Sequence, residues 1–266
     1  HDEEILASIA KLKPLKDQFC NVVDYLCRYN LDDSLRDLNL FFENLIPYMN
    51  HKGVGQYFKY QFDNIRFIAE ELFLSKMAIL LKNQKFESAH DFINTSFLSR
   101  SSSNGLSNVR FDKFQSSIES LNTIRKNKLK SNRISLSYDL MKERSESTKG
   151  ITFDNICEAD FILWFNAISS KNRLHWFPGT LAFIDEYSPN LEIFVRAESK
   201  KFFEKFKIVL NVDSLDDLKL KFNEIISNND LNSVIKVKSI PNKQWGMFKK
   251  GWNKVRCIRE NGGTDY

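Results

Sequence analysis

Residues 56–82 read QYFKYQFDNIRFIAEELFLSKMAILLK and predict the longest helix of the chain. The first half of this segment carries one apolar stripe at helical spacing, which includes Phe58, Phe62, Ile65 and Ala69. Beyond Leu72, apolar residues occupy nearly every side of the helix. Because a helix that is apolar all round is usually buried, we expect this segment to lie in the middle of a helical domain.

Further helices are predicted on both sides of this segment. Pro14 suits the first turn of a helix over 14–30, and Asp32 or Asp33 can cap a second helix that runs to about Met49. Each of the two has an apolar stripe, and we expect the stripe of the second helix to face inward. The stripes are Phe19, Val22, Val23, Leu26 and Cys27, and Leu35, Leu38, Phe41, Phe42 and Leu45.

The segment after the long helix is predicted to continue as shorter helices. We expect them over 84–96, 112–129 and 134–146, with the serine-rich stretch 99–108 as a loop. The chain has only 9 Gly and 5 Pro in 266 residues, which favours helices over a sandwich of many strands. A polar break at 145–150 marks the expected domain boundary.

The pattern changes after this break. Residues 153–169 predict a strongly apolar helix, and residues 175–186 and 191–197 are rich in the aromatic and β-branched residues typical of strands. A helix over 199–210 and a capping box at 214–217, opening another helix to about 228, follow. Residues 233–240 read as one more strand.

The expected fold class is therefore mainly α with a small α/β part. An N-terminal helical bundle would occupy residues 1–148. A domain of helix–strand–strand–helix order, with a short mixed or antiparallel sheet and a basic C-terminal segment, would occupy 149–266.

A candidate catalytic site lies in the predicted strand pair. Side chains alternate along a strand, so Glu198 and Lys200 would share one face, with Asp185 near the end of the preceding strand. Asp185 and Glu198 would hold Mg²⁺, which prefers oxygen ligands. The metal and Lys200 would together activate a water for attack on a phosphate. Glu158 on the preceding helix would add a carboxylate.

This order of residues resembles the PD-(D/E)xK nuclease pattern over about fifty residues. The resemblance implies a Mg²⁺-dependent nuclease with Asp185, Glu198 and Lys200 as its catalytic residues. The sequence departs from the pattern because no Pro precedes Asp185. In an alternative reading, Glu198 and Ser199 begin the next helix, where a carboxylate is favourable, and Lys200 faces solvent.

A second candidate site is the basic, aromatic segment 231–259, which contains no acidic residue. Lys and Arg neutralise phosphates, and aromatic rings stack on unpaired bases. The same composition also suits a solvated strand face or a surface for an acidic protein. The residues expected to contact nucleic acid are Lys236, Lys238, Lys243, Trp245, Lys249, Lys250, Trp252, Lys254 and Arg256.

Composition sets the remaining expectations. The net charge of +5 leans mildly toward anionic partners. The four cysteines lack zinc-ligand spacing, which predicts free thiols in a reducing, cytoplasmic compartment. No apolar run has the length of a membrane span, so we expect no membrane contact. The chain begins at His1 rather than Met, which leaves open the expectation that a further domain precedes it.

Two functions fit these observations. The first is a non-catalytic interaction or regulatory module of a larger intracellular assembly, without a cofactor. Its partner would be another protein or a further domain of the same polypeptide, and its basic segment would contact nucleic acid. The alternative is the Mg²⁺-dependent nuclease. We favour the first because no recognised catalytic set appears, and it predicts an apolar or basic surface that stays exposed in the isolated chain.

Overall fold

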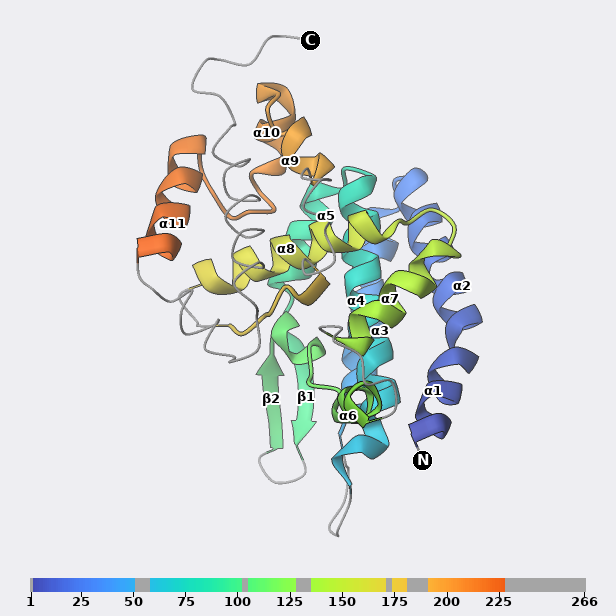
Figure 1. Cartoon of the computed structure of the whole chain (residues 1–266). Coiled ribbons are helices and arrows are strands. Elements are labelled where there is room, and N and C mark those ends of the chain that lie inside the picture. The colour runs from blue at the N-terminus through green and yellow to red at the C-terminus, as the bar shows by residue number, and fades with distance from the viewer. Residues whose placement is uncertain are drawn as a thin grey trace. The chain divides into compact units, whose positions relative to one another are not determined.

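The computed structural model describes residues 2–50, 58–101, 105–127, 135–170, 174–180 and 191–227 (Figure 1). The chain forms two compact units, residues 1–156 and 157–266. The expected fold class, mainly α with a short antiparallel sheet, is confirmed. The expected division at 148/149 stays a prediction.

The first unit contains most of the described helices. Those that match the expected segments are α2 (Lys13–Arg28), α3 (Asp32–Leu45) with the short 3-10 turn η1 (Ile46–Tyr48), α4 (Asp63–Lys82), α5 (Phe86–Asn94) and α7 (Leu136–Glu146). The helix expected over 112–129 is instead a 3-10 turn, η3 (Phe111–Phe114), followed by α6 (Glu119–Asn127). Sequence reasoning did not predict α1 (Asp2–Lys11) or the 3-10 turn η2 (Lys59–Phe62).

Helix α4 forms the core of this unit, as expected. Every residue from Phe67 to Leu81 is buried, and α1, α2 and α5 all contact this helix (Figure 1). The ring of Phe73 stacks on Phe92 and Phe114 at centroid distances of 4.3 and 4.8 Å, and Phe42 meets it edge-on at 5.3 Å. Such aromatic pairs stabilise the core beyond the area they bury.

The sheet lies where a loop was expected. Strand β1 (Phe97–Ser101) pairs antiparallel with β2 (Gly105–Val109), from Phe97 opposite Val109 to Ser101 opposite Gly105 (Figure 1). Gly105 has a φ of +74°, a conformation that tight hairpins require and glycine adopts without strain. The loop prediction for 99–108 is therefore wrong.

The described core of the second unit is built from aromatic side chains. Its elements are α8 (Phe153–Ser169), which matches its predicted bounds and begins just before the division, α9 (Glu192–Arg196), α10 (Lys200–Phe206) and α11 (Leu215–Ser227). The ring of Phe161 meets Phe194 edge-on at 5.2 Å, and Phe165 lies 4.6 Å from Phe222. At the start of α11, the Ser214 hydroxyl accepts a hydrogen bond from the Asp217 N–H, which confirms the predicted cap.

The strand expected over 191–197 is a helix. Ile193, Phe194 and Ala197 are the buried positions, a spacing that fits one side of a helix and not the alternation of a strand. Residues 174–180 contain no strand either. The rest of the segment 175–186 and the strand expected over 233–240 lie outside the described residues.

Candidate functional site

The predicted catalytic residues are only partly visible in the described chain. Asp185 lies outside the described residues. Glu198 lies in the turn after α9, Ser199 precedes α10, and Lys200 is the first residue of that helix. Glu198 and Lys200 are both exposed. The alternative reading of 198–200 as a helix start is therefore confirmed, and the nuclease assignment itself stays a prediction.

Glu158, the additional carboxylate of that hypothesis, is buried in the second unit. Its Oε1 accepts a 2.8 Å hydrogen bond from the backbone N–H of Ile193, in the first turn of α9. A carboxylate there satisfies an N–H group that has no partner inside the helix. Among the described residues, no group of three or more His, Cys, Asp or Glu side chains is placed to hold a metal ion.

The residues expected to contact nucleic acid, from Lys236 to Arg256, all lie outside the described chain. The cysteines were expected to be free thiols, and three of the four lie among the described residues. Cys20, Cys27 and Cys157 are buried free thiols. Burial raises the pKa of Cys20 to about 11 and that of Cys27 to about 12, so both stay protonated and unreactive at neutral pH. In the described segments, no helix is long and apolar enough to cross a membrane.

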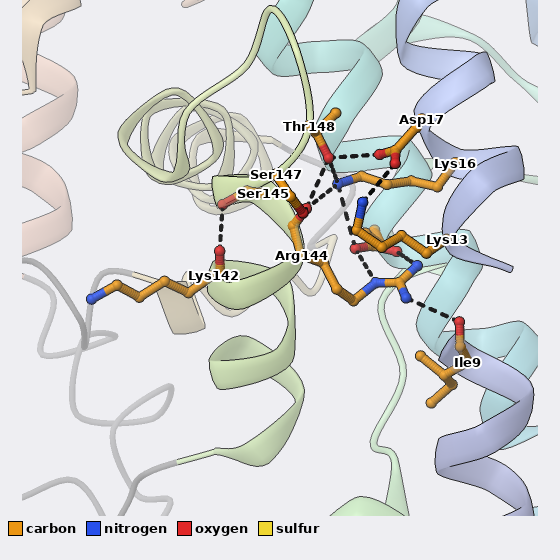
Figure 2. A network of polar contacts seen from close by, with 10 residues as sticks. Ile9, Lys13, Lys16, Asp17, Lys142, Arg144, Ser145, Ser147 and Thr148 are labelled. Atoms are coloured by element: carbon orange, nitrogen blue, oxygen red, sulfur yellow. Dashed lines mark hydrogen bonds and ion pairs between the residues drawn. The ribbon is translucent and has the colours of Figure 1, made fainter. Parts of the chain in front are cut away.

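A buried network of polar contacts joins α7 to α1, α2 and α4 (Figure 2). The Arg144 guanidinium donates to both carboxylate oxygens of Glu71, at 2.7 and 2.9 Å, and to the carbonyl oxygen of Ile9 at 3.0 Å. Lys16 Nζ donates to Thr148 Oγ1 at 2.7 Å and lies 3.8 Å from Glu71. These groups satisfy one another's hydrogen-bonding capacity, so we interpret the network as structural, holding α1, α2, α4 and α7 together.

Lys76 is a third buried basic side chain, besides Lys16 and Arg144, and lies on the side of α4 that faces α3. Its Nζ donates to the carbonyl oxygen of Leu35 at 2.9 Å and to Asn39 Oδ1 at 2.7 Å, and lies 4.2 Å from the ring centroid of Phe92. Burial lowers its pKa from 10.5 to about 7. A small hollow lined in part by Leu35 and Asn39 has room for about one water molecule.

The outer side of the α2–α3 hairpin is the third feature. On α2, the stripe that packs inward consists of Lys16, Cys20, Val23 and Cys27. Beside it runs a second apolar stripe that reaches solvent, and α3 continues this surface. We define the α2–α3 face as Leu15, Phe19, Val22, Leu26 and Tyr29 on α2, with Leu38, Phe41, Leu45 and Tyr48 on α3 and η1.

This face corrects the prediction that the whole apolar stripe of α3 points inward. Val22 is 49% exposed and Phe41 is 39% exposed, while Leu15, Tyr29 and Tyr48 are each about 60% exposed. The rings of Phe19 and Phe41 lie 5.3 Å apart, which makes the two helices one continuous apolar surface. Its signal in the sequence is an apolar arc wider than one core-facing stripe.

The described elements of the first unit thus offer a helical scaffold with buried basic side chains and an exposed apolar face on α2 and α3. Comparison with known proteins adds no relative: no protein-family model, no curated protein and no solved structure matches this chain.

Proposed function

We propose that the chain is a non-catalytic interaction module that binds a helix of a partner protein on the α2–α3 face. The observation that carries the proposal is the exposure of large apolar side chains on adjacent turns of two packed helices. Exposed apolar side chains that occur singly need no explanation, whereas a contiguous set marks an interaction site.

The spacing of the face indicates what kind of element binds it. Leu15, Phe19, Val22, Leu26 and Tyr29 follow one another at intervals of four and three residues, the spacing of a heptad seam. The residues on α3 and η1 follow the same rule. Side chains at this spacing form the holes into which the side chains of a second helix insert. A partner helix is therefore the element that matches the surface.

The energy available at this face supports stable binding. Burying one exposed Val, Leu or aromatic side chain stabilises a complex by roughly 1.5–3 kcal/mol before the costs of association are subtracted. Five members of the face are more than a third exposed, so several such side chains are available. Tyr29 and Tyr48 each add a hydroxyl that can remain in water at the rim.

The wider proposal places this module in a larger intracellular assembly, in a reducing, cytoplasmic compartment. Three buried free thiols support a reducing location. A contact between residues 236–256 and nucleic acid belongs to the same proposal, supported by the basic and aromatic composition of that segment. It predicts binding to single-stranded DNA or RNA whose affinity falls as salt rises.

The test of the proposed function is site-specific photo-crosslinking in the cells that produce the chain. A benzoylphenylalanine at Val22 should crosslink to a partner protein at positions spaced three and four residues apart, whereas the same probe at the exposed Lys142 of α7 should not. The purified partner should then bind Val22→Asp about thirtyfold more weakly, because about 2 kcal/mol of apolar burial is lost. Lys142→Asp should leave the affinity unchanged.

Two results would overturn this proposal. One is an affinity for the purified partner that Val22→Asp does not change. The other is crosslinking from Val22 only to a second copy of the chain or to nucleic acid.

A further inference from the structure

We infer that the partner helix carries a basic side chain that pairs with Asp37 at the rim of the α2–α3 face. This inference rests on the proposed function, because it concerns the partner bound at the same face. The inference adds that the partner helix is basic and that Asp37 selects this partner.

The charge of the hairpin is opposite to that of the chain. Residues 13–48 contain four basic and six acidic side chains, a net charge of −2, whereas the whole chain has a net charge of +5. The surface that binds the partner is therefore locally acidic. Complementary charge across an interface steers encounter and excludes wrong partners.

The basic side chains of the hairpin are already engaged by carboxylates. Lys13 lies 2.6 Å from Asp17, and Arg28 lies 2.6 Å from Asp24. Arg36 pairs with Asp33 at 3.1 Å and also lies 3.6 Å from Asp91. The fourth, Lys16, is buried in the network with Glu71 and Arg144.

Asp37 differs from these acids. It is exposed, and no ion pair to it is found among the described residues. It lies four residues before Phe41, so both side chains emerge on the same side of α3. A helix seated on Phe41 would bring its flanking side chains alongside Asp37, where a Lys or Arg is favourable and a Glu or Asp is repelled.

The same charges argue against the other molecules that could bind the α2–α3 face. A second copy of the chain would place two hairpins of net charge −2 against each other, which is unfavourable. Nucleic acid and anionic lipid would meet Asp37 with like charge. A basic amphipathic helix is the occupant whose stripe and flanks both match the face.

The experiment measures binding of synthetic stapled helices to the full chain by fluorescence anisotropy. The probe has about three heptads with leucine at the seam positions and lysine beside them. One matched probe replaces the flanking lysines with glutamate, and another has the lysine probe's composition with the leucine stripe scrambled. The chain variants are Asp37→Asn, Asp37→Lys and the control Glu143→Lys, which changes an exposed acid of α7.

The wild-type chain should prefer the lysine probe over the glutamate probe. Asp37→Asn should weaken binding of the lysine probe by about two- to fivefold at low salt, in line with a pair at an exposed rim. Asp37→Lys should reverse the preference, and Glu143→Lys should leave it intact. The charge preference should shrink as salt rises, while binding through the stripe persists.

The possible failures are distinguishable. If the scrambled probe binds as well as the intact one, the proposed function fails, and this inference fails with it. If binding depends on the stripe but the Asp37→Lys variant still prefers lysine, or the wild type shows no preference, only this inference fails. Circular dichroism of each variant checks that the helices remain folded.

Discussion

Replacement of Lys76 by methionine should remove most of a pH dependence of stability in the first unit. The Lys76 amine is 1% exposed and donates to two neutral acceptors, the Leu35 carbonyl and Asn39 Oδ1. Burial lowers its pKa from 10.5 to about 7 in the folded chain. Between these two pH values, the unfolded chain binds a proton at Lys76 that the folded chain does not. Stability therefore rises with pH across this window.

The magnitude follows from the size of the pKa change. One bound proton of difference gives a slope of about 1.4 kcal/mol per pH unit, so the full window corresponds to roughly 5 kcal/mol. The thiols of Cys20 and Cys27 act in the opposite direction, because their pKa values are raised above the usual 9. Their contribution is present below pH 9 and lost as pH rises toward 11 and 12. The Lys76 effect is therefore measured below pH 9.

The assay is hydrogen exchange of the α4 amides at pH 7 and pH 8.5, corrected for the intrinsic pH dependence of exchange. In the wild-type chain the free energy of opening should increase by about 2 kcal/mol between these pH values. Lys76→Met should remove most of the increase, since methionine fills the space without titrating, while Lys16, whose pKa burial also lowers, contributes in the same direction. The control Lys142→Met, at an exposed position of α7, should retain it. An equal increase in Lys76→Met would refute the assignment.

Two further substitutions test the other buried charges. Arg144→Met leaves Glu71 buried without its guanidinium partner and should destabilise the first unit by about 3–5 kcal/mol in urea unfolding, whereas Lys142→Met should have little effect. Burial raises the pKa of Asp160 from 3.8 to about 6, so the contribution of this group to the stability of the second unit should be largest below pH 4 and fall by up to about 3 kcal/mol as pH rises through 6. Trp176, which donates to Asp160, should report this loss by fluorescence, and Asp160→Asn should remove the pH dependence.

The long helices were predictable because their own sequence determines them. Helix α4 is apolar nearly all round beyond Leu72 and α8 is strongly apolar, and both lie where periodicity places them. The β1–β2 hairpin and α9 depend instead on contacts from distant residues. The N–H of Leu98 donates to Glu43, and α9 has five residues and starts where Glu158 accepts from Ile193. The serine-rich composition of residues 99–108 led to their prediction as a loop, although the dipeptide Asn-Gly at 104–105 is a known signal for a β-hairpin.

The candidate site was predictable only in its residue types. The sequence predicted the apolar stripes of α2 and α3 but assigned the whole stripe of α3 to the inside and gave no exposed side on α2. In the structure Val23 and Cys27 pack inward, while Val22, one position away, reaches solvent. Periodicity shows that an apolar arc exists, but the arc that the core covers depends on the neighbouring helices. Lys76 was missed for the same reason, because a lysine within an apolar run gives no sign of its burial.

Two of the buried basic side chains, Lys16 and Lys76, lie behind the α2–α3 face. Lys16 joins the inner side of α2 to Thr148 and Glu71, and Lys76 joins α4 to the inner side of α3. On the inner side of the face, hydrogen bonds of the Lys16 amine therefore fix α2, and those of the Lys76 amine fix α3. A surface ordered before binding loses little conformational entropy when a partner arrives, so more of its apolar burial contributes to affinity. Under the proposed function, weakening the contacts of Lys76 should therefore reduce partner affinity without altering any residue of the face.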